Sequence, residues 1–358
     1  MHFHRIREIN LYEMKPSILL VGNFLSARGV NRTLVEEFSE GLASAGYTLI
    51  TTSRIYSRLP RLMDMLWTAF SCRNSYQIAY VEVYSDAAFI WAELVCALLR
   101  LLRKPYLLAL HGGSLPIFAR RWPGRVKRLL DSAAAVAAPS GFLQKEMSPY
   151  RKDIVLIPNS LFIKNYTFRL RSAPRPSLVW LRAFHDIYNP QMVPRLIDHL
   201  RIPFPDIVLE MIGPDKADGA LQETQAEIEK LSLQNYIEIV PGIPKSEVPA
   251  YLSRSDIFIN TANVDNTPVS VLEAMACGLC VVSTNVGGIP YLLQDGQDAL
   301  LVEPNDPCAM AAAVQRVLTE PGLAEQFSGN GRRKVEQFEW LVVLQQWQAI
   351  FERMIWDG

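Results

Sequence analysis

The sequence predicts an α/β fold in which two Rossmann-like domains hold their parallel sheets on either side of a central cleft. Its 358 residues, of which 49% are hydrophobic, suffice for two domains that each bury a core. Short aliphatic and β-branched runs alternate with helical stretches, which is typical of parallel sheets covered by helices. The alternation stops once, in a polar stretch with several prolines at 159–176, and then restarts. This interruption predicts a linker near residue 170.

Six strands are expected in each half of the chain. In the first half they lie at residues 17–21, 48–52, 77–83, 106–110, 134–139 and 153–158. In the second half they lie at residues 177–181, 207–213, 237–242, 257–260, 280–285 and 299–303. We therefore expect an N-terminal domain over residues 1–170, a C-terminal domain over 171–335 and a final amphipathic helix within 336–358.

The two halves carry opposite charge. Residues 1–170 contain 22 Lys and Arg against 12 Asp and Glu, a net +10, whereas residues 171–358 contain 14 against 24, a net −10. Opposite charge is consistent with two domains that have different partners. It is equally consistent with two halves that attract each other on closing.

Cysteine usage and apolar runs favour a cytoplasmic protein. The five cysteines are scattered and no secretory leader precedes the first apolar run, so a reducing compartment is expected. Cys277 and Cys280 have redox spacing, but they straddle a predicted helix end and the next strand, which favours small packing residues. The apolar stretch 87–99 is interrupted by Glu93 and is too short to span a bilayer, so it predicts a buried crossover helix.

The most informative segment follows the strand at 257–260. In open parallel sheets, ligands bind beyond the carboxyl ends of the strands. There Thr267 fits a helix N-cap, Pro268 fits the first helical position and Gly278 fits the residue after the helix. The start of such a helix presents backbone N–H groups and partial positive charge to an anion.

Acids and glycines around this helix complete a candidate ligand site. Asp265 lies before the helix and Glu273 within it, so both carboxylates can reach a polyhydroxylated ligand. The alternative is a helix that carries acids near its N-terminus only because they suit the helix dipole. Gly287 and Gly288 follow the next strand, where they would let the backbone approach a ligand closely or would simply form a tight turn.

Four segments together resemble glycosyltransferase family 4, also described as glycosyl transferases group 1. They are the stretch from Asp265 to Glu273, the run Glu273-Ala-Met-Ala-Cys-Gly278, the turn Gly287-Gly288-Ile-Pro290 and the segment Asp295-Gly-Gln-Asp-Ala-Leu-Leu-Val302. The resemblance covers roughly residues 17–350 and is most specific at 257–304. It implies the GT-B fold, retaining chemistry and a last helix that crosses back to the first domain.

The resemblance also implies roles for individual residues. Glu273 matches the acid that binds the donor ribose, and Asp265 matches the acid near the transferred sugar, although the family has Glu there. His111 lies in the half that faces the acceptor, before two glycines, and matches a group near the donor phosphate and sugar. Further donor-binding residues are expected at Gly29, Gly112, Gly113, Ile243, Asn266, Thr267, Pro268, Val269, Gly287 and Gly288.

The family places an Arg and a Lys after the first strand of the second domain, where they offset charge on the leaving diphosphate. Arg182 matches the Arg, but residues 187–189 occupy the place of the Lys. His185 or a helix N-terminus starting at Asn189 would then have to supply part of the lost stabilisation. The expected catalytic residues are thus Asp265, His111 and Arg182.

No metal or cofactor is expected. The chain contains no Asp-x-Asp motif, the usual ligand of a metal-bound diphosphate in the other large transferase fold. A nucleotide diphosphate sugar would be the substrate, and the departing phosphate oxygen would accept the proton of the acceptor.

Basic and aromatic residues in the first half suggest a membrane surface. Arg54, Arg58, Arg61 and Arg73 interleave with apolar residues that include Trp67, and a second basic set runs over 120–128 with Trp122. Such a helix can lie on an anionic membrane, or it can be a core helix with a solvated cationic edge. Nucleic acid is not expected, because no recognition motif accompanies the charge.

The function predicted from these features is transfer of a hexose or N-acetylhexosamine to a glycan or lipid-linked saccharide, in polysaccharide or glycoconjugate synthesis. The site would be cytoplasmic or at the inner face of the membrane. A nucleotide-sugar epimerase of the same fold and a non-catalytic nucleotide-sugar-binding scaffold are the alternatives.

Overall fold

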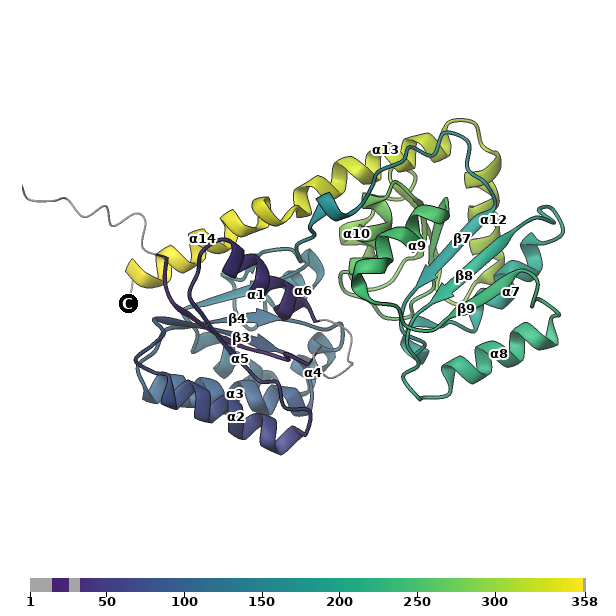
Figure 1. Cartoon of the computed structure of the whole chain (residues 1–358). Coiled ribbons are helices and arrows are strands. Elements are labelled where there is room, and N and C mark those ends of the chain that lie inside the picture. The colour runs from purple at the N-terminus through teal and green to yellow at the C-terminus, as the bar shows by residue number, and fades with distance from the viewer. Residues whose placement is uncertain (1–14, 26–32, 357–358) are drawn as a thin grey trace, which may run out of the picture.

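The computed structural model describes residues 15–25 and 33–356. In this part of the chain, two separate six-stranded parallel sheets form two α/β domains (Figure 1), which confirms the predicted fold class. The first sheet has the order β2-β1-β3-β4-β5-β6 and the second has the order β12-β11-β10-β7-β8-β9. The second order is that of a doubly wound sheet, which reverses direction between β7 and β10.

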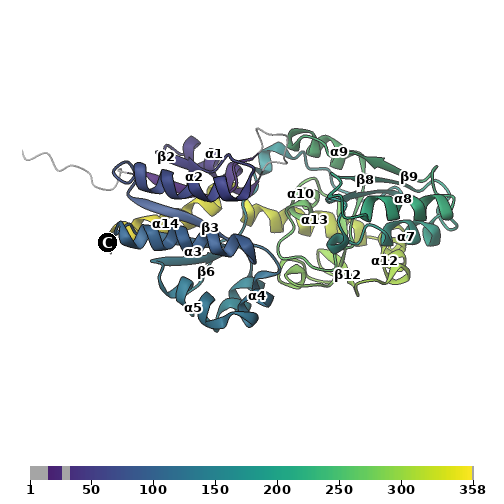
Figure 2. The same ribbon diagram turned by 90° about the horizontal axis from the view of Figure 1, so that it is seen from below.

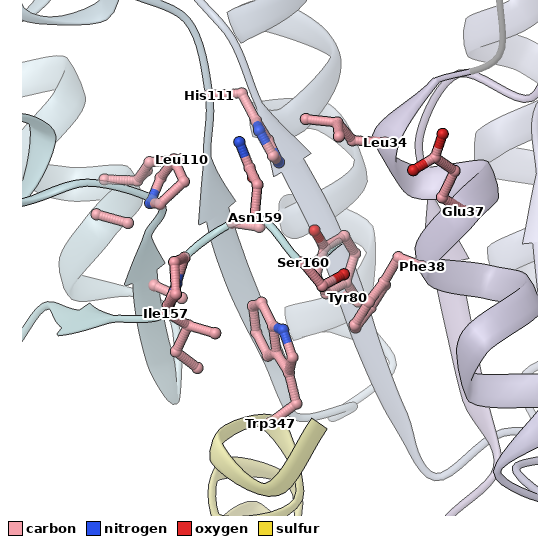
Figure 3. Close-up of a pocket in the computed structure, with 15 residues that line it drawn as sticks. Leu34, Glu37, Phe38, Tyr80, Leu110, His111, Ile157, Asn159, Ser160 and Trp347 are labelled. Carbon is pink, nitrogen blue, oxygen red and sulfur yellow. The ribbon is translucent and has the colours of Figure 1, made fainter. Parts of the chain in front are cut away.

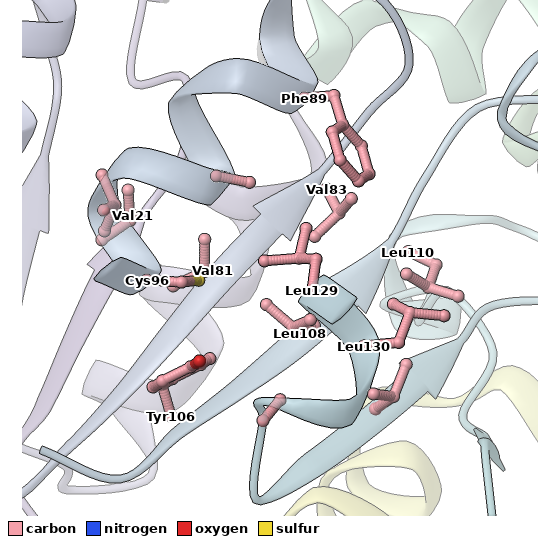
Figure 4. Close-up of a cluster of buried hydrophobic side chains, with 14 of the residues drawn as sticks. Val21, Val81, Val83, Phe89, Cys96, Tyr106, Leu108, Leu110, Leu129 and Leu130 are labelled. Carbon is pink, nitrogen blue, oxygen red and sulfur yellow. The ribbon is translucent and has the colours of Figure 1, made fainter. Parts of the chain in front are cut away.

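The strands of the first sheet are β1 (Ile18–Val21), β2 (Leu49–Thr52), β3 (Ile78–Val83), β4 (Tyr106–Leu110), β5 (Ala135–Ala138) and β6 (Val155–Leu156). The helices of this domain are α1 (Leu34–Ser44), α2 (Arg58–Ser71), α3 (Ala87–Leu101), α4 (Leu115–Arg121), α5 (Pro123–Asp131) and α6 (Gly141–Met147). Aliphatic side chains of the strands alternate between the two faces of the sheet, so each face builds its own core. One core lies beneath α3 and α5, where Phe89, Cys96 and Leu129 pack on Val81 and Leu108 (Figure 4).

The strands of the second sheet are β7 (Ser177–Leu181), β8 (Val208–Ile212), β9 (Ile237–Val240), β10 (Ile257–Asn260), β11 (Cys280–Thr284) and β12 (Ala299–Val302). The helices here are α7 (Met192–Leu200), α8 (Ala220–Lys230), α9 (Val248–Arg254), α10 (Val269–Ala276), α11 (Ile289–Leu292), α12 (Pro307–Thr319) and α13 (Leu323–Val335). Helices α7 and α12 cover one face of the sheet, and α9 and α10 cover the other.

The last helix, α14 (Trp340–Trp356), leaves the second domain and packs on the first (Figure 1). Its side chains Trp347 and Phe351 lie in the same core as Phe38 of α1 and Tyr80 of β3. Where the chain crosses, the Leu161 N–H donates to Phe338 O at 2.7 Å and the Trp340 N–H donates to Leu161 O at 3.0 Å. The two crossing segments are therefore joined by backbone hydrogen bonds.

The segment that enters the second domain is held by a buried ionic cluster. Asp256 is fully buried, and its carboxylate forms ion pairs with three arginines. Its oxygens lie 3.2 Å from Nε of Arg171 and 3.1 Å from Nε of Arg175, and the Arg169 guanidinium also contacts it. Burial raises the pKa of the Asp256 carboxyl, but the hydrogen bonds from Arg175 and Arg169 outweigh that effect and hold the pKa below its usual value. The polar linker of the sequence is thus a fixed part of the second domain.

The paired cysteines Cys277 and Cys280 fit their predicted role as packing residues. Both thiols are buried, and burial raises the pKa of Cys277 to about 11 and that of Cys280 to about 12, which does not fit a redox pair.

The prediction of a buried crossover helix at 87–99 is only half right. Helix α3 buries one face but leaves Ile90, Leu94 and Leu101 exposed. Among the helices that the structure describes, none is long and apolar enough to cross a membrane.

Candidate functional site

A cavity of about 1200 Å³ lies between the carboxyl ends of the two sheets. Loops that follow β3, β4 and β5 line it from the first domain, and loops that follow β7, β8, β9 and β10 line it from the second. The crevice includes the point between β7 and β10 where the strand order reverses, which is where open α/β sheets bind ligands. The loops after the strands are therefore the place where functional side chains converge.

Arg182 and Asp265 meet on the second-domain side of this cavity. Arg182 follows β7 and Asp265 lies in the loop after β10, and their side chains form an ion pair, with 13% and 10% of their surface exposed. The Arg182 guanidinium also lies 4.6 Å from the centre of the Tyr188 ring. Burial lowers the pKa of Arg182, but an arginine remains charged at neutral pH. The two predicted catalytic groups thus neutralise each other.

Glu273 lies on the buried side of α10 and belongs to a second polar cluster. Its carboxylate accepts a hydrogen bond from the Tyr166 hydroxyl and lies 2.7 Å from Lys245 Nζ. Lys245 Nζ also lies 3.8 Å from Oε1 of Glu37, on α1 of the first domain. Burial and the neighbouring Glu273 raise the pKa of Tyr166 well above its usual range, so its hydroxyl stays protonated and donates. Glu273 is therefore an oriented acceptor at the edge of the cleft.

The start of helix α10 differs by one residue from the predicted start. The helix begins at Val269 and its N-cap is Pro268, whose ψ of 112° is extended, so the prediction of Thr267 as N-cap was wrong. Thr267 instead points to the first domain, where its hydroxyl lies 3.5 Å from Pro139 O. Gly278 follows the helix with a φ of +81°, as predicted for a C-terminal glycine.

His111 lies across the cleft, after β4, in a buried polar contact. Its Nε2 lies 3.5 Å from Oε1 of Glu82 at the end of β3, and its ring stacks on Tyr84 with centroids 5.2 Å apart. Burial lowers the pKa of His111 to about 4 and raises that of Glu82 to about 8. Both groups are therefore neutral near pH 7, and His111 Nε2 and Glu82 Oε2 have no hydrogen-bond partner within the described residues.

The predicted donor-binding residues fall into two groups. Gly112, Gly113, Ile243, Asn266, Thr267 and Val269 line the cleft together with Arg182 and Glu273. Pro268, Gly287 and Gly288 do not line it. A Cβ on Gly287 would lie 2.2 Å from Asp265 O, and one on Gly288 would lie 1.8 Å from Asn266 O. These two glycines allow a close approach to the Asp265 loop rather than to the cavity, so they position that loop. Gly29 lies outside the residues that the structure describes.

The residues expected to replace the missing lysine lie elsewhere. His185 Nδ1 accepts a hydrogen bond from the Ile187 N–H at 3.2 Å and lies 3.3 Å from Asp218 Oδ2, away from the cavity lining. Asn189 ends a 3-10 helix over Asp186–Tyr188 with a left-handed φ of 48°, and the next α-helix, α7, starts only at Met192. The prediction of a helix N-terminus at Asn189 was therefore wrong.

Two residues that line the cleft, Lys216 and Lys245, and one beside it, Tyr166, were not predicted from the sequence. Tyr166 and Lys245 hold Glu273, and Lys216 lines the cavity from the loop after β8. Lys216 and Lys245 each follow a Gly-Pro or Gly-x-Pro turn directly after a predicted strand, which was a usable signal. Tyr166 lies in the linker, and nothing in its local sequence marks it.

A small side chamber of about 40 Å³ adjoins the cleft in the first domain (Figure 3). Phe38, Tyr80 and Trp347 form its apolar floor, and His111 and Asn159 line both the chamber and the cleft. The chamber therefore extends the cleft towards α1 and α14. Among the described residues, no group of three or more His, Cys, Asp or Glu side chains is arranged to hold a metal ion.

Comparison with known proteins relates the second domain to one family. Residues 174–334 match the family model described as glycosyl transferases group 1. The chain is 27% identical to D-inositol 3-phosphate glycosyltransferase of Paenarthrobacter aurescens (strain TC1) over 266 residues, which make up 70% of this chain and 65% of that protein. It is 28% identical over 174 residues to GDP-mannose-dependent alpha-(1-6)-phosphatidylinositol monomannoside mannosyltransferase of Mycolicibacterium smegmatis, covering 46% of this chain and 45% of that protein. The chain thus spans less than two thirds of these relatives.

Solved structures resemble nearly the whole chain. Anabaena HepE, in complex with UDP and glucose, superposes with a TM-score of 0.74 and 16% identity over 94% of this chain and 100% of that one. At this identity the likeness shows the fold, and it confirms the predicted two-domain architecture.

Proposed function

We propose, on the premise that residues 174–334 belong to the glycosyl transferases group 1 family, that the chain is a glycosyltransferase using a nucleotide diphosphate sugar as donor. One observation carries the proposal: Arg182, Asp265 and Glu273 come from three separate segments and converge on one cleft. Solvent-shielded cations and carboxylates in a crevice at the carboxyl end of a parallel sheet suit a sugar nucleotide, which has phosphate charge and many hydroxyls.

The donor would lie along the second domain. Glu273, held by Tyr166 and Lys245, would accept hydrogen bonds from the ribose hydroxyls. Arg182 would offset the charge that develops on the leaving diphosphate, because a preorganised cation in a buried site stabilises such charge strongly. For this, Arg182 has to exchange Asp265 for phosphate oxygens, which frees the Asp265 carboxylate for the sugar hydroxyls.

The acceptor would approach from the first domain. The neutral His111 ring faces the cleft from this side and can exchange a hydrogen bond with a sugar hydroxyl without bringing charge. For retention of configuration, the departing phosphate oxygen would take the acceptor proton on the same face of the sugar. In this scheme no protein nucleophile or divalent metal takes part, so we expect transfer to persist in EDTA.

We also propose that the acceptor is a saccharide at the inner face of an anionic membrane, in polysaccharide or glycoconjugate synthesis. The relative named for phosphatidylinositol monomannoside supports an acceptor of this kind. Five unpaired cysteines fit a reducing compartment.

The outer surface of the first domain supports membrane contact. Helices α2 and α3 pack side by side on this surface (Figure 2). Leu59, Met63 and Trp67 recur at helical spacing on the outside of α2 and are 76%, 65% and 68% exposed. Arg54, Arg58 and Arg100 are exposed on or beside the same two helices and complement anionic headgroups. Arg61 does not contribute, because it is buried and donates to Ile55 O at 2.7 Å.

A transfer assay separates this proposal from its alternatives. Purified protein would be incubated with labelled UDP-, GDP-, ADP- and TDP-sugars in EDTA, with and without an anionic lipid extract, and the products would be resolved by mass. A sugar-extended product that requires the extract supports the transferase. Interconversion of the donor sugar without any acceptor identifies an epimerase, and donor binding without turnover identifies a scaffold.

A further inference from the structure

We propose that Lys216 supplies the second cation for the diphosphate of the donor, in place of the lysine missing after Arg182. The inference rests on the proposed function and concerns the same cleft. No Lys or Arg occurs at positions 183–194, so the loop after β7 offers only Arg182. Strand β8 lies next to β7 in the second sheet (Figure 1). Lys216 lies in the loop after β8 and, like Arg182, lines the cavity.

Backbone contacts fix this loop against the loop of Arg182. The Phe184 N–H donates to Pro214 O at 2.9 Å, and the Lys216 N–H donates to Phe184 O at 3.1 Å. These bonds prolong the pairing of β7 with β8 past the ends of both strands. A Cβ on Gly213 would lie 1.7 Å from Arg182 O, so only glycine permits the two loops to approach so closely. Lys216 therefore has a fixed backbone position next to Arg182.

The charge balance of the cleft singles out Lys216. Arg182 is paired with Asp265, and Lys245 with Glu273 and Glu37. Lys216 is the remaining Lys or Arg of the cavity lining within the described residues, and its ammonium has no carboxylate at ion-pair distance there. A cation without a protein counter-ion can bind phosphate without first breaking an ion pair.

The acids nearest to Lys216 are turned to other groups. Asp215 accepts the Ala217 N–H at 2.8 Å and lies 3.4 Å from the Gln222 amide nitrogen. Asp218 accepts the Asp186 N–H at 3.0 Å and contacts His185. Asp215 thus stabilises its own loop and Asp218 joins this loop to the loop after β7, so both carboxylates leave the ammonium available.

A second cation at this place would add to the stabilisation of the departing diphosphate. When the sugar bond breaks, the diphosphate gains negative charge, and a single arginine, which must first exchange Asp265 for the phosphate oxygens, offsets only part of that charge. A lysine is a compact point charge with three donors on a flexible stem, so it can follow the phosphate as it departs. Lys216 would therefore contact the diphosphate in the ground state and more strongly as the bond breaks.

The test compares Lys216→Met with Lys152→Met, a matched variant of an exposed lysine on the first domain. Binding of the preferred nucleoside diphosphate and of the corresponding nucleoside monophosphate would be measured by calorimetry, and transfer by kcat and KM. We expect Lys216→Met to weaken diphosphate binding roughly tenfold to hundredfold, the usual range for a charged hydrogen bond. Binding of the nucleoside monophosphate should change less, and kcat should fall. Lys216→Arg should keep part of the diphosphate affinity and part of kcat that Lys216→Met loses.

Each other outcome contradicts a particular statement. Equal diphosphate binding and equal kcat in Lys216→Met and wild type overturn the role of Lys216 while leaving the proposed function intact. If Lys216→Met weakens binding of the nucleoside monophosphate as much as binding of the diphosphate, the variant disturbs the cleft as a whole, which also overturns the proposed role of Lys216. A wild-type protein that binds no nucleoside diphosphate overturns the proposed function, and the role of Lys216 with it. Melting temperatures of the three variants control for folding.

Discussion

Arg182 and Asp265 show how a candidate catalytic pair also bears on stability. The two side chains neutralise each other in a largely buried place, so removing one partner leaves an uncompensated charge. We predict that Arg182→Met lowers the free energy of unfolding by roughly 3–5 kcal/mol and that the added change Asp265→Asn recovers much of this loss. Urea unfolding of the single and double variants measures the coupling.

The control for this cycle is Arg316→Met, which breaks an exposed pair with Glu320. Exposed pairs contribute about 1 kcal/mol or less. A similar loss in both arginine variants, or no recovery in the double variant, would contradict the description of Arg182 and Asp265 as a neutralised buried pair.

The contact of Glu82 with His111 predicts a pH dependence of stability. Burial raises the pKa of Glu82 from 4.5 to about 8, so the folded protein retains a proton that the unfolded chain loses. The stabilisation is fully present below pH 4.5 and is lost as pH rises towards 8. His111 acts oppositely, because its lowered pKa of about 4 makes stability rise between about pH 4 and 6.5. Of these two groups, therefore, only Glu82 changes the free energy of unfolding between pH 6.5 and 8.

Glu82→Gln keeps the shape of the side chain and removes its proton equilibrium. We predict that the free energy of unfolding of the wild type falls between pH 6.5 and 8 relative to this variant, by on the order of 1–3 kcal/mol. Urea unfolding at several pH values measures the difference. Parallel pH profiles of wild type and variant would show that Glu82 is already ionised in the folded protein.

At the scale of elements, the strands could be predicted from sequence and the helix contacts could not. All twelve strands of the two sheets lie where the aliphatic runs predict them, because buried parallel strands need continuous apolar sequence. The outer face of α3 could not be predicted, because an exposed apolar stripe and a buried one have the same spacing. The start of α10 also differed, because the fixed φ of a proline is compatible with an extended as well as a helical ψ, and Pro268 adopts the extended one.

Helix α2 carries a prediction about the membrane. We predict that changing Leu59, Met63 and Trp67 together to Ser leaves the melting temperature nearly unchanged, because all three are exposed. Binding to vesicles of phosphatidylcholine with phosphatidylglycerol should weaken at least about tenfold, since each buried apolar side chain contributes about 1.5–3 kcal/mol. Vesicle co-sedimentation measures the binding.

Ile202→Ser provides the comparison, since Ile202 is an exposed apolar residue of the second domain. Unchanged vesicle binding in the triple variant, or a large drop in its melting temperature, would refute α2 as the membrane-contacting helix.

At the scale of the whole molecule, the candidate site depends on contacts between segments far apart in sequence. The Ser140 hydroxyl of the first domain contacts Asn266, and Lys245 of the second domain reaches Glu37. Sequence patterns report neighbours along one strand or helix, so they marked Asp265 and Glu273 but not their partners. Only the folded chain shows which cations of the cleft are paired with carboxylates. The role proposed for Lys216 therefore could not be predicted from the sequence.

Helix α14 joins the domains and should contribute strongly to the stability of the first. Trp347 packs on Phe38, Tyr80 and Phe351, with ring centroids 5.2, 5.6 and 6.1 Å away. We predict that Trp347→Ala costs about 3–5 kcal/mol, the usual range for a buried aromatic residue, whereas Trp356→Ala, at an exposed position, changes stability little. Urea unfolding followed by circular dichroism compares them. Equal effects would show that α14 is not an integral part of the first domain.

The most direct test of the proposed donor site is calorimetric titration of UDP, GDP, ADP and TDP into the wild-type protein and into Glu273→Gln. We predict that one of the four diphosphates binds the wild type and that the variant, with its melting temperature checked, binds it roughly tenfold more weakly or worse, because the charged acceptor of the ribose is lost. No binding to the wild type, or equal binding to the variant, would contradict a nucleotide-sugar site in this cleft.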